Sequence, residues 1–263
     1  VQYLDLCAAL TGRIPCTGLF RDDRRRATVE LDVSILRDAA WRRSGGFALL
    51  GLWLGRELTH GEVPWLSGMP PDTTRDELRT LGAAAASAGS LALFHAEGLT
   101  PEAPDRAAAA GDGIVERRSV TTRALRSMAA DLAAPAGTPL NAVCLGTPHY
   151  SLDELRRLHA GIEASGCPSV PVFVTTSRAT LARADAEELG QRLKDQGVTV
   201  LTDTCTYYGQ VVPGLAGTVM TDSAKWAWYG SGNLGVRPVL AGLERCLASA
   251  HAGRVVDGED EIP

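Results

Sequence analysis

The chain has 263 residues, of which 45% are hydrophobic and 22% charged, a balance typical of soluble globular proteins. Its formal net charge of −5 argues against a nucleic-acid-binding surface. No apolar run approaches the ~18 residues that a membrane-spanning helix needs. The 6 cysteines show no CxxC spacing, which favours neither a zinc ribbon nor a disulfide scaffold and indicates a reducing, cytoplasmic compartment.

The first half of the chain predicts helices and strands in an irregular order. Residues 27–33 alternate apolar and polar side chains, as a half-buried strand does. The apolar run 47–54 fits either a helix or a strand, and the alanines at 83–86 favour close helix packing. The remaining expected elements are helices at 3–11, 34–43, 74–89 and 118–133, a buried strand at 91–95 and a loop at 60–72.

From residue 140 the pattern alternates regularly between strands and helices. Ser151 and Glu154 form a capping box, in which each side chain satisfies a free backbone amide at the start of a helix. The glycine-rich stretch 230–235 does not fit a phosphate-binding loop and is expected to be a flexible loop. The alternation predicts a parallel sheet. Its strands are expected at 142–145, 170–174, 198–201 and up to 219–220, and its helices at 151–164, 178–196 and 237–252.

The stretch from Pro135 to Pro139 is the best candidate for an internal boundary. We therefore expect an N-terminal α/β portion at 1–135 and a Rossmann-like α/β portion at 136–263. Val1 stands inside an apolar pattern, whereas amino termini are usually polar and frayed, so we expect that residues upstream are missing.

Polar groups follow each strand expected in the second half. Ligands of open parallel sheets bind beyond the carboxyl ends of the strands, so these groups are expected to share one edge. They are residues 147–149, 175–177, 203–205 and 221–225.

Single residues at this edge each have a functional and a structural interpretation. Cys205 could be a reactive or metal-binding thiol, or a small buried hydrophobic residue. His149 could bind a carboxylate, transfer a proton or bind a metal, or it could bond the backbone of a loop. Lys225 could pair with a carboxylate or phosphate, or lie on the surface. Cys246 stands within an expected helix, where packing alone would explain it.

Several separated segments, in the same order, resemble the aconitase X dehydratases. The most specific are 145–151 (LGTPHYS), 203–205 (DTC) and 220–226 (MTDSAKW). Earlier segments at 3–15 and 94–103 (FHAEGLTPEA) also resemble the family. The resemblance covers nearly the whole chain. It implies an aconitase-like, three-layer α/β/α fold with mainly parallel sheets.

The resemblance implies a hydro-lyase that removes water from a small hydroxy-carboxylic acid. In this family a proton leaves one carbon and hydroxide leaves its neighbour, with an iron centre as Lewis acid on the hydroxyl. Thr147 and residues 206–208 look more like the bacterial cis-3-hydroxy-L-proline type than the archaeal phosphomevalonate type.

The resemblance also implies roles for individual residues. Cys205 and Cys246 would hold an iron or iron–sulfur centre, for which we favour the two-iron, two-sulfur type. Asp203 would help to orient Cys205. The catalytic residues implied are His149, Ser223 and Lys225. The substrate contacts implied are Thr147, His149, Thr204, Ser223 and Lys225.

Three features depart from the family pattern. An upstream cysteine-bearing segment and a small swivelling domain, which supplies a serine base, are absent, so we expect a partner subunit or a fused domain to provide them. Asp222 stands where the family usually has Asn. A partly desolvated carboxylate there would repel an anionic substrate by up to about a few kcal/mol.

Two alternatives remain open from the sequence. The chain could be a non-catalytic binding or scaffold subunit, or a decayed fragment, without metal. It could also be an enzyme that uses Cys205 as nucleophile with His149 as its base.

Overall fold

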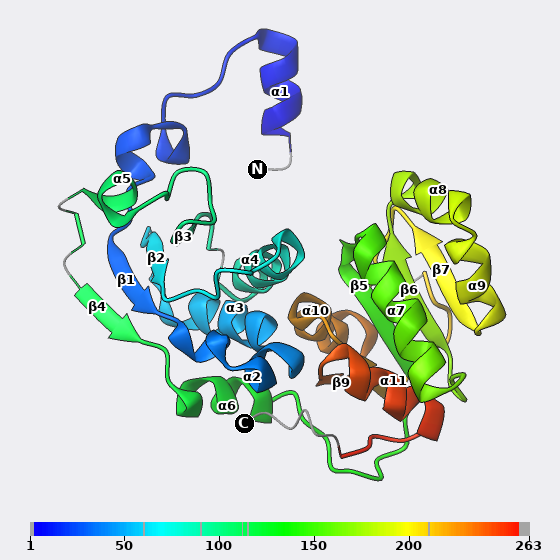
Figure 1. Cartoon of the computed structure of the whole chain (residues 1–263). Coiled ribbons are helices and arrows are strands. Elements are labelled where there is room, and N and C mark those ends of the chain that lie inside the picture. The colour runs from blue at the N-terminus through cyan, green and yellow to red at the C-terminus, as the bar shows by residue number, and fades with distance from the viewer. Residues whose placement is uncertain are drawn as a thin grey trace.

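The computed structural model describes residues 3–59, 61–89, 91–111, 113–114, 116–209 and 211–257. It contains two separate parallel sheets, a four-stranded one in the order β3-β2-β1-β4 and a five-stranded one in the order β7-β6-β5-β8-β9 (Figure 1). The predicted parallel α/β class is therefore confirmed. The strands are β1 (Val29–Asp32), β2 (Pro64–Ser67), β3 (His95–Ala96), β4 (Glu116–Ser119), β5 (Ala142–Tyr150), β6 (Val172–Thr176), β7 (Val198–Thr202), β8 (Thr218–Thr221) and β9 (Arg237–Leu240).

Helices pack against both sheets. The core of the first sheet lies mainly between its strands and α3, α4 and α6. The second sheet has one core on the face covered by α7, α8, α9 and α11, and another on the face covered by α10. The helices are α1 (Leu4–Thr11), α2 (Ala39–Arg43), α3 (Gly46–Glu57), α4 (Arg75–Gly89), α5 (Arg106–Ala110), α6 (Thr122–Ala130), α7 (Leu152–Ser165), α8 (Arg178–Ala186), α9 (Leu189–Asp195), α10 (Ala224–Leu234) and α11 (Leu243–Ala252).

Small residues bring α3 and α4 into close contact. A Cβ atom added to Gly51 would lie 2.4 Å from the Leu81 carbonyl oxygen, and one added to Gly55 would lie 2.6 Å from the Ala85 carbonyl oxygen. Both distances are below van der Waals contact, so only glycine fits at this crossing. The close packing that the alanines at 83–86 predicted is therefore present, and the ambiguous run 47–54 is helical.

The predicted capping box at the start of α7 is confirmed. The Glu154 backbone amide donates to Ser151 Oγ, and the Ser151 amide donates to Glu154 Oε2 over 2.8 Å. The helix expected at 178–196 is two helices, because Glu188 adopts a positive φ of 59° and separates α8 from α9.

Several of the expected elements are wrong in type or extent. The expected loop at 60–72 contains β2, and the expected helices at 118–133 and 237–252 each begin later than predicted, after the short strands β4 and β9. The buried strand expected at 91–95 is reduced to β3, and the first part of the helix expected at 34–43 is a 3-10 helix, Ser34–Arg37. β4 and β9 are edge strands, and proline and charge are tolerated at such edges. Pro238 and the charged residues of Glu116–Ser119 do not have the pattern typical of a strand. The sequence therefore did not indicate β9 and β4.

The stretch 230–235 is also not the expected flexible loop. It forms the end of α10, which stops at Gly235 in the left-handed conformation. Gly230 lies so close to the Trp226 ring that an added Cβ would come within 2.9 Å of it. The glycine thus permits ring packing along the helix.

Contacts between α4 and α7 join the two sheets' layers. Ser151 Oγ donates to Asp76 Oδ2 over 2.6 Å, and Arg79 Nη2 lies 2.5 Å from Glu154 Oε2. Arg79 also pairs with Asp76 at 3.1 Å within α4. Glu154 is buried, and this burial raises the pKa of its carboxyl. The junction is therefore an ordered polar network rather than a flexible linker.

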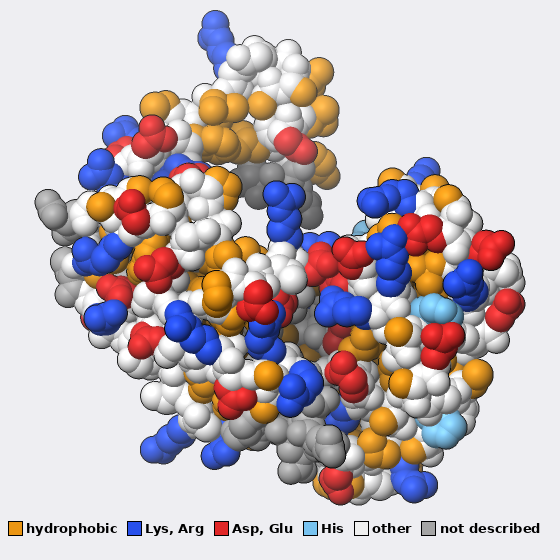
Figure 2. All heavy atoms as spheres, in the orientation of Figure 1, with side chains coloured by type: hydrophobic (Ala, Val, Ile, Leu, Met, Phe, Trp, Pro, Cys, Tyr) orange, Lys and Arg blue, Asp and Glu red, His pale blue; other side chains and the backbone are white. Residues whose placement is uncertain are grey.

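None of residues 3–26 is buried in a core. None of the residues of α1 is buried, and Figure 1 shows this helix standing away from the sheets. Hydrophobic side chains gather on this segment in Figure 2. The large exposed ones are Tyr3, Leu6, Leu10, Ile14 and Phe20. In the described part of the chain, no helix has the length and hydropathy to cross a membrane.

Candidate active site

The polar segments expected at one edge do follow the strands of the five-stranded sheet. β5 carries Thr147, Pro148 and His149 at its carboxyl end, after a bulge that begins at Gly146. Gly146 has a φ of 85°, and a Cβ there would lie 2.2 Å from the Thr175 carbonyl oxygen, so the bulge requires glycine. The bulge turns the end of β5 and places the following side chains beside the loops after β7 and β8.

His149 is fixed by the loop after β7. Its Nε2 lies 2.7 Å from the Thr204 carbonyl oxygen. A carbonyl only accepts hydrogen bonds, so Nε2 carries the proton and Nδ1 of the neutral ring is an acceptor. The imidazole is thereby held in one orientation with one nitrogen available for chemistry.

Asp203 stabilises the same loop. Its φ of 57° is unusual for a residue with a side chain. Its carboxylate accepts from the Arg178 backbone amide and pairs with the Arg178 guanidinium. These hydrogen bonds and charges hold the pKa of Asp203 below its usual value. The loop that carries Thr204 and Cys205 is thus attached to the start of α8.

Thr147 and Ser223 are in contact at the centre of the edge. Ser223 Oγ donates to the Thr147 carbonyl oxygen and accepts from the Trp226 amide over 3.0 Å, where it caps α10. Ser223 is 4% exposed and Thr147 is 1% exposed. The Thr147 hydroxyl is buried without a hydrogen-bond partner among the described residues.

Asp222 is partly buried and pairs with the buried Tyr150. The Tyr150 hydroxyl donates to Asp222 Oδ2. The pKa of Asp222 is raised to about 7, mainly by removal from water and also by the nearby Glu154 carboxylate, against the lowering effect of the Tyr150 hydrogen bond. Near neutral pH this carboxyl therefore exchanges a proton at little cost in free energy.

The two predicted thiol ligands do not lie together. Cys205 is partly buried and packs in the core on the α10 face of the sheet, whereas Cys246 is fully buried in the core on the α11 face. Burial raises the pKa of the Cys246 thiol well above its ordinary value, and metal ligation needs the thiolate. No group of three or more His, Cys, Asp and Glu side chains placed to hold a metal ion occurs within the described ranges. These residues therefore do not by themselves fit an iron–sulfur centre.

Lys225 lies in the first turn of α10 and is partly exposed. The aromatic residues beside it extend the core instead of lining a described cavity. The Trp226 indole donates to Thr206 Oγ1 over 2.8 Å, and the Tyr207 and Tyr229 rings stack with centroids 5.2 Å apart. These aromatic contacts fix the start of α10 and therefore the position of Lys225.

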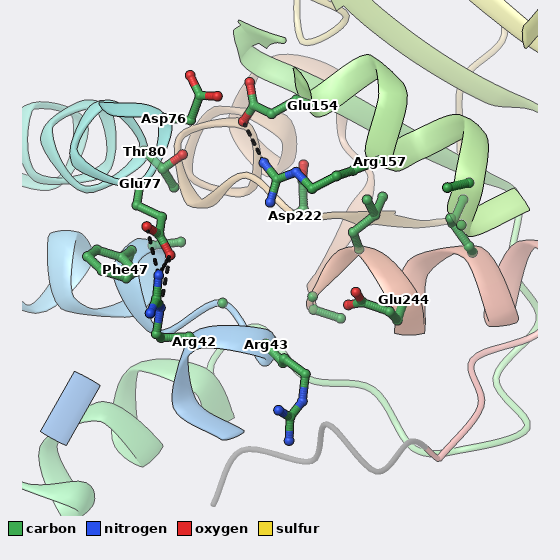
Figure 3. Close-up of a pocket in the computed structure, with 18 of the residues that line it drawn as sticks. Arg42, Arg43, Phe47, Asp76, Glu77, Thr80, Glu154, Arg157, Asp222 and Glu244 are labelled. Carbon is green, nitrogen blue, oxygen red and sulfur yellow. Dashed lines mark hydrogen bonds and ion pairs between the residues drawn. The ribbon is translucent and has the colours of Figure 1, made fainter. Parts of the chain in front are cut away.

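Two adjoining cavities open beside this edge. A small one of about 20 Å³ lies between Thr147, Ser223 and Asp222. A larger one of about 560 Å³ lies where the helices of the two sheets meet (Figure 3). Thr80, Glu154 and Asp222 line both cavities. The larger volume suits a small metabolite.

Sequence reasoning missed part of this lining. Tyr150 lies within the predicted 145–151 motif but was given no role, and it could have been found by its position beside His149. Thr80 comes from α4, which belongs to the other sheet's layers, and Glu154 was interpreted only as a cap. No local pattern could have placed these side chains beside Asp222, because Thr80 and Glu154 lie 142 and 68 positions before it in the chain.

A parallel α/β fold with polar groups collected at the strand ends and an adjoining cavity is the arrangement of a small-molecule enzyme. Comparison with known proteins identifies the family. The aconitase X second domain matches residues 27–130, and the aconitase X third domain matches residues 140–252. The chain belongs to the aconitase X family.

Individual relatives agree with this assignment. A cis-3-hydroxy-L-proline dehydratase of Pseudomonas aeruginosa is 37% identical over 96% of this chain and 44% of its own length. A phosphomevalonate dehydratase large subunit of Thermococcus kodakarensis is 30% identical over 85% of this chain and 55% of its own length. The holo-form crystal structure of Thermococcus kodakaraensis aconitase X superposes with a TM-score of 0.81 and 29% identity, covering 93% of this chain and 60% of that chain. The chain thus spans about half the length of these relatives.

Proposed function

We propose that this chain is the large catalytic part of a hydro-lyase that dehydrates a small hydroxy-carboxylic acid such as cis-3-hydroxy-L-proline. The observation that carries this proposal is the 37% identity to a cis-3-hydroxy-L-proline dehydratase over nearly the whole chain. The edge formed by the ends of β5, β7 and β8, with its adjoining cavity, supports it.

The catalytic residues in this proposal are His149, Ser223 and Lys225. His149, oriented through Nε2, offers Nδ1 for proton transfer. Lys225 supplies the positive charge that a substrate carboxylate needs. Ser223 would exchange its bond to the Thr147 carbonyl for one to the substrate. The substrate-binding set also contains Thr147, whose buried hydroxyl has no described partner, and Thr204.

The proposed cofactor is an iron or iron–sulfur centre of the two-iron, two-sulfur type, with Cys205 and Cys246 among its ligands. Thiolates are the donors that such centres use, and the family points to this cofactor. Cys205 and Cys246 pack on opposite faces of the sheet, so the described residues of this chain do not form such a centre by themselves.

The proposal extends to partners, domains and location. A small swivelling domain, as a separate subunit or fused, would complete the active site, in line with the partial coverage of the relatives. The portions 1–135 and 136–263 would be the two domains, which the two separate sheets support. The free cysteines support a reducing, cytoplasmic location.

A second candidate is a binding or scaffold subunit without metal. The separation of Cys205 from Cys246 favours it. In that case hydroxyproline would raise the unfolding temperature of an iron-free sample, and no turnover would follow on addition of iron and a small subunit.

The first experiment is an anaerobic iron and sulfide assay with a visible spectrum, on the chain alone and mixed with a candidate small subunit. Stoichiometric iron with thiolate-to-iron absorbance, together with turnover of cis-3-hydroxy-L-proline, is the expected result. Cys205→Ser should lose the absorbance, whereas Cys167→Ser, at an exposed thiol, should keep it. An unchanged iron content in Cys205→Ser would remove Cys205 from the ligand set.

A further inference from the structure

One buried hydroxyl at the candidate site has no described partner. Thr147 is 1% exposed and is one of the residues that line the small cavity with Asp222 and Ser223, and its Oγ1 is buried without a hydrogen-bond partner among the described residues. Buried polar groups are almost always hydrogen-bonded, so an unpaired one in a cavity indicates that a ligand atom binds there. A substrate hydroxyl or carboxylate oxygen would satisfy it.

Asp222 connects this position to the larger cavity. It lines both cavities, and the Tyr150 hydroxyl fixes its carboxyl in place. Figure 3 shows Asp222 below Glu154 and beside Arg157, among the residues that line the larger cavity. A ligand that reaches Thr147 from the larger cavity therefore passes against the Asp222 carboxyl.

The charges around Asp222 leave it without a direct cationic partner among the described residues. The other titratable groups that act on it are Tyr150, Glu154, Arg157 and, from α11, Cys246. Arg157 is the one cation in this set, and it pairs with Glu154 at 3.9 Å. A negative group in such surroundings favours a ligand that brings its own positive charge.

A cyclic hydroxy-amino acid brings such a charge. Its secondary ammonium donates two hydrogen bonds and is separated by one carbon from its carboxylate. A hydroxy acid without nitrogen offers only negative charge, which the Asp222 carboxylate would repel.

We propose that Asp222, held by Tyr150, binds the ammonium group of the substrate and so selects a hydroxy-amino acid over hydroxy acids that lack nitrogen. This inference rests on the proposed dehydratase function and names the substrate class of that same site. Asp222 is in this view a specificity-determining residue, and the Asp that departs from the family pattern is suited to an amino-acid substrate.

Calorimetric titration of the full chain with two ligands tests this inference. The ligands are cis-3-hydroxy-L-proline and its nitrogen-free ring analogue, cis-2-hydroxycyclopentane-1-carboxylate. Asp222→Asn keeps the size and can still accept from Tyr150, so it should weaken hydroxyproline binding at least tenfold and leave the analogue's affinity equal or higher. Glu244→Gln, which removes a carboxylate elsewhere in the larger cavity, should change neither affinity.

The outcomes separate this inference from the proposed function. Unchanged hydroxyproline affinity in Asp222→Asn, or an equal loss for both ligands, would overturn the ammonium role while leaving the dehydratase proposal in place. Retained binding of the analogue shows that the variant is folded. If the unmodified chain bound neither ligand, the proposed function would fail and this inference with it.

Discussion

His149 Nε2 and the Thr204 carbonyl oxygen lie 2.7 Å apart, although 55 residues separate them in the chain. This bond joins the end of β5 to the loop that carries Cys205. It gives the imidazole one tautomer and one orientation. Two of the three most specific segments of the sequence, 145–151 and 203–205, are therefore in direct contact.

His149→Gln is expected to lower dehydratase turnover by about 10²-fold or more, because loss of a positioned acid–base group typically costs about 10²–10⁴ in rate. Its effect on the free energy of unfolding should stay near 1 kcal/mol, about the worth of one hydrogen bond. Turnover with a candidate small subunit and urea unfolding measure the two effects. His159→Gln, which alters a histidine of α7 bonded to Gln196, is the matched control and should keep turnover. Full turnover in His149→Gln would exclude an acid–base role.

Arg79→Gln is expected to destabilise the fold by about 1–3 kcal/mol, because it leaves the buried Glu154 carboxylate without its partner across the junction. Arg156→Gln removes an arginine from an exposed pair with Glu187 and should cost less than Arg79→Gln, because water and salt screen exposed ion pairs. Urea unfolding at neutral pH compares the two variants. Equal losses would mean that the junction between the sheets' layers adds nothing to stability.

Gly51→Ala should destabilise the protein although alanine favours helices. The added methyl would meet the Leu81 carbonyl oxygen at 2.4 Å, so α3 and α4 would have to separate, at about 1–3 kcal/mol. Gly232→Ala lies in α10 with open space around the added Cβ and should instead stabilise by up to about 1 kcal/mol. Thermal unfolding of both variants gives opposite shifts. A rise in unfolding temperature for Gly51→Ala would show that the helices pack less closely than described.

The raised pKa of Asp222 predicts a pH dependence of stability. The carboxyl titrates near 3.8 when unfolded and at about 7 when folded. Between these values the folded state holds a proton that the unfolded state has released, so stability from this group falls as pH rises from about 4 to 7. The fall should be about 1–4 kcal/mol, at about 1.4 kcal/mol per pKa unit. Urea unfolding between pH 4.5 and 8 should show a flatter slope for Asp222→Asn.

Asp203→Asn is the control, because folding lowers the pKa of Asp203 whereas it raises the pKa of Asp222. Arg178 lowers the pKa of Asp203, so the stability from that group is present above pH 4 and is lost as pH falls further. The slope between pH 4.5 and 8 should therefore stay as in the unmodified chain. A slope unaffected by Asp222→Asn would place the proton on another group, with Glu154 as the next candidate.

Elements with strong local signals could be predicted from the sequence. The Ser151–Glu154 capping box and the buried strands of the central sheet combine propensity, periodicity and helix-start residues that agree with one another. The edge strands β4 and β9 could not be predicted, because a strand such as β9 with Pro238 is stabilised by its neighbour β8 rather than by its own residues. The helical state of 230–235 could not be predicted either, because it depends on the packing of Gly230 against the Trp226 ring.

The candidate site also has a part that could be predicted from the sequence and a part that could not. His149, Thr147 and Ser223 come from motifs at strand ends and were found there. The hydrogen bonds of His149 and Ser223 to the backbone could not be predicted. The bond to the Thr204 carbonyl and the bond from the Trp226 amide depend on the folded loops. The position of Cys246 relative to Cys205 depends on which face of the sheet each element covers, which spacing in the chain does not encode.

The strand order of the first sheet has a consequence for synthesis on the ribosome. β1 is paired on one side with β2, which follows closely, but on the other side with β4, which emerges more than 80 residues later. Until then one backbone edge of β1 has no partner, and such edges attract other chains. A nascent chain paused before residue 116 should therefore be the most aggregation-prone intermediate.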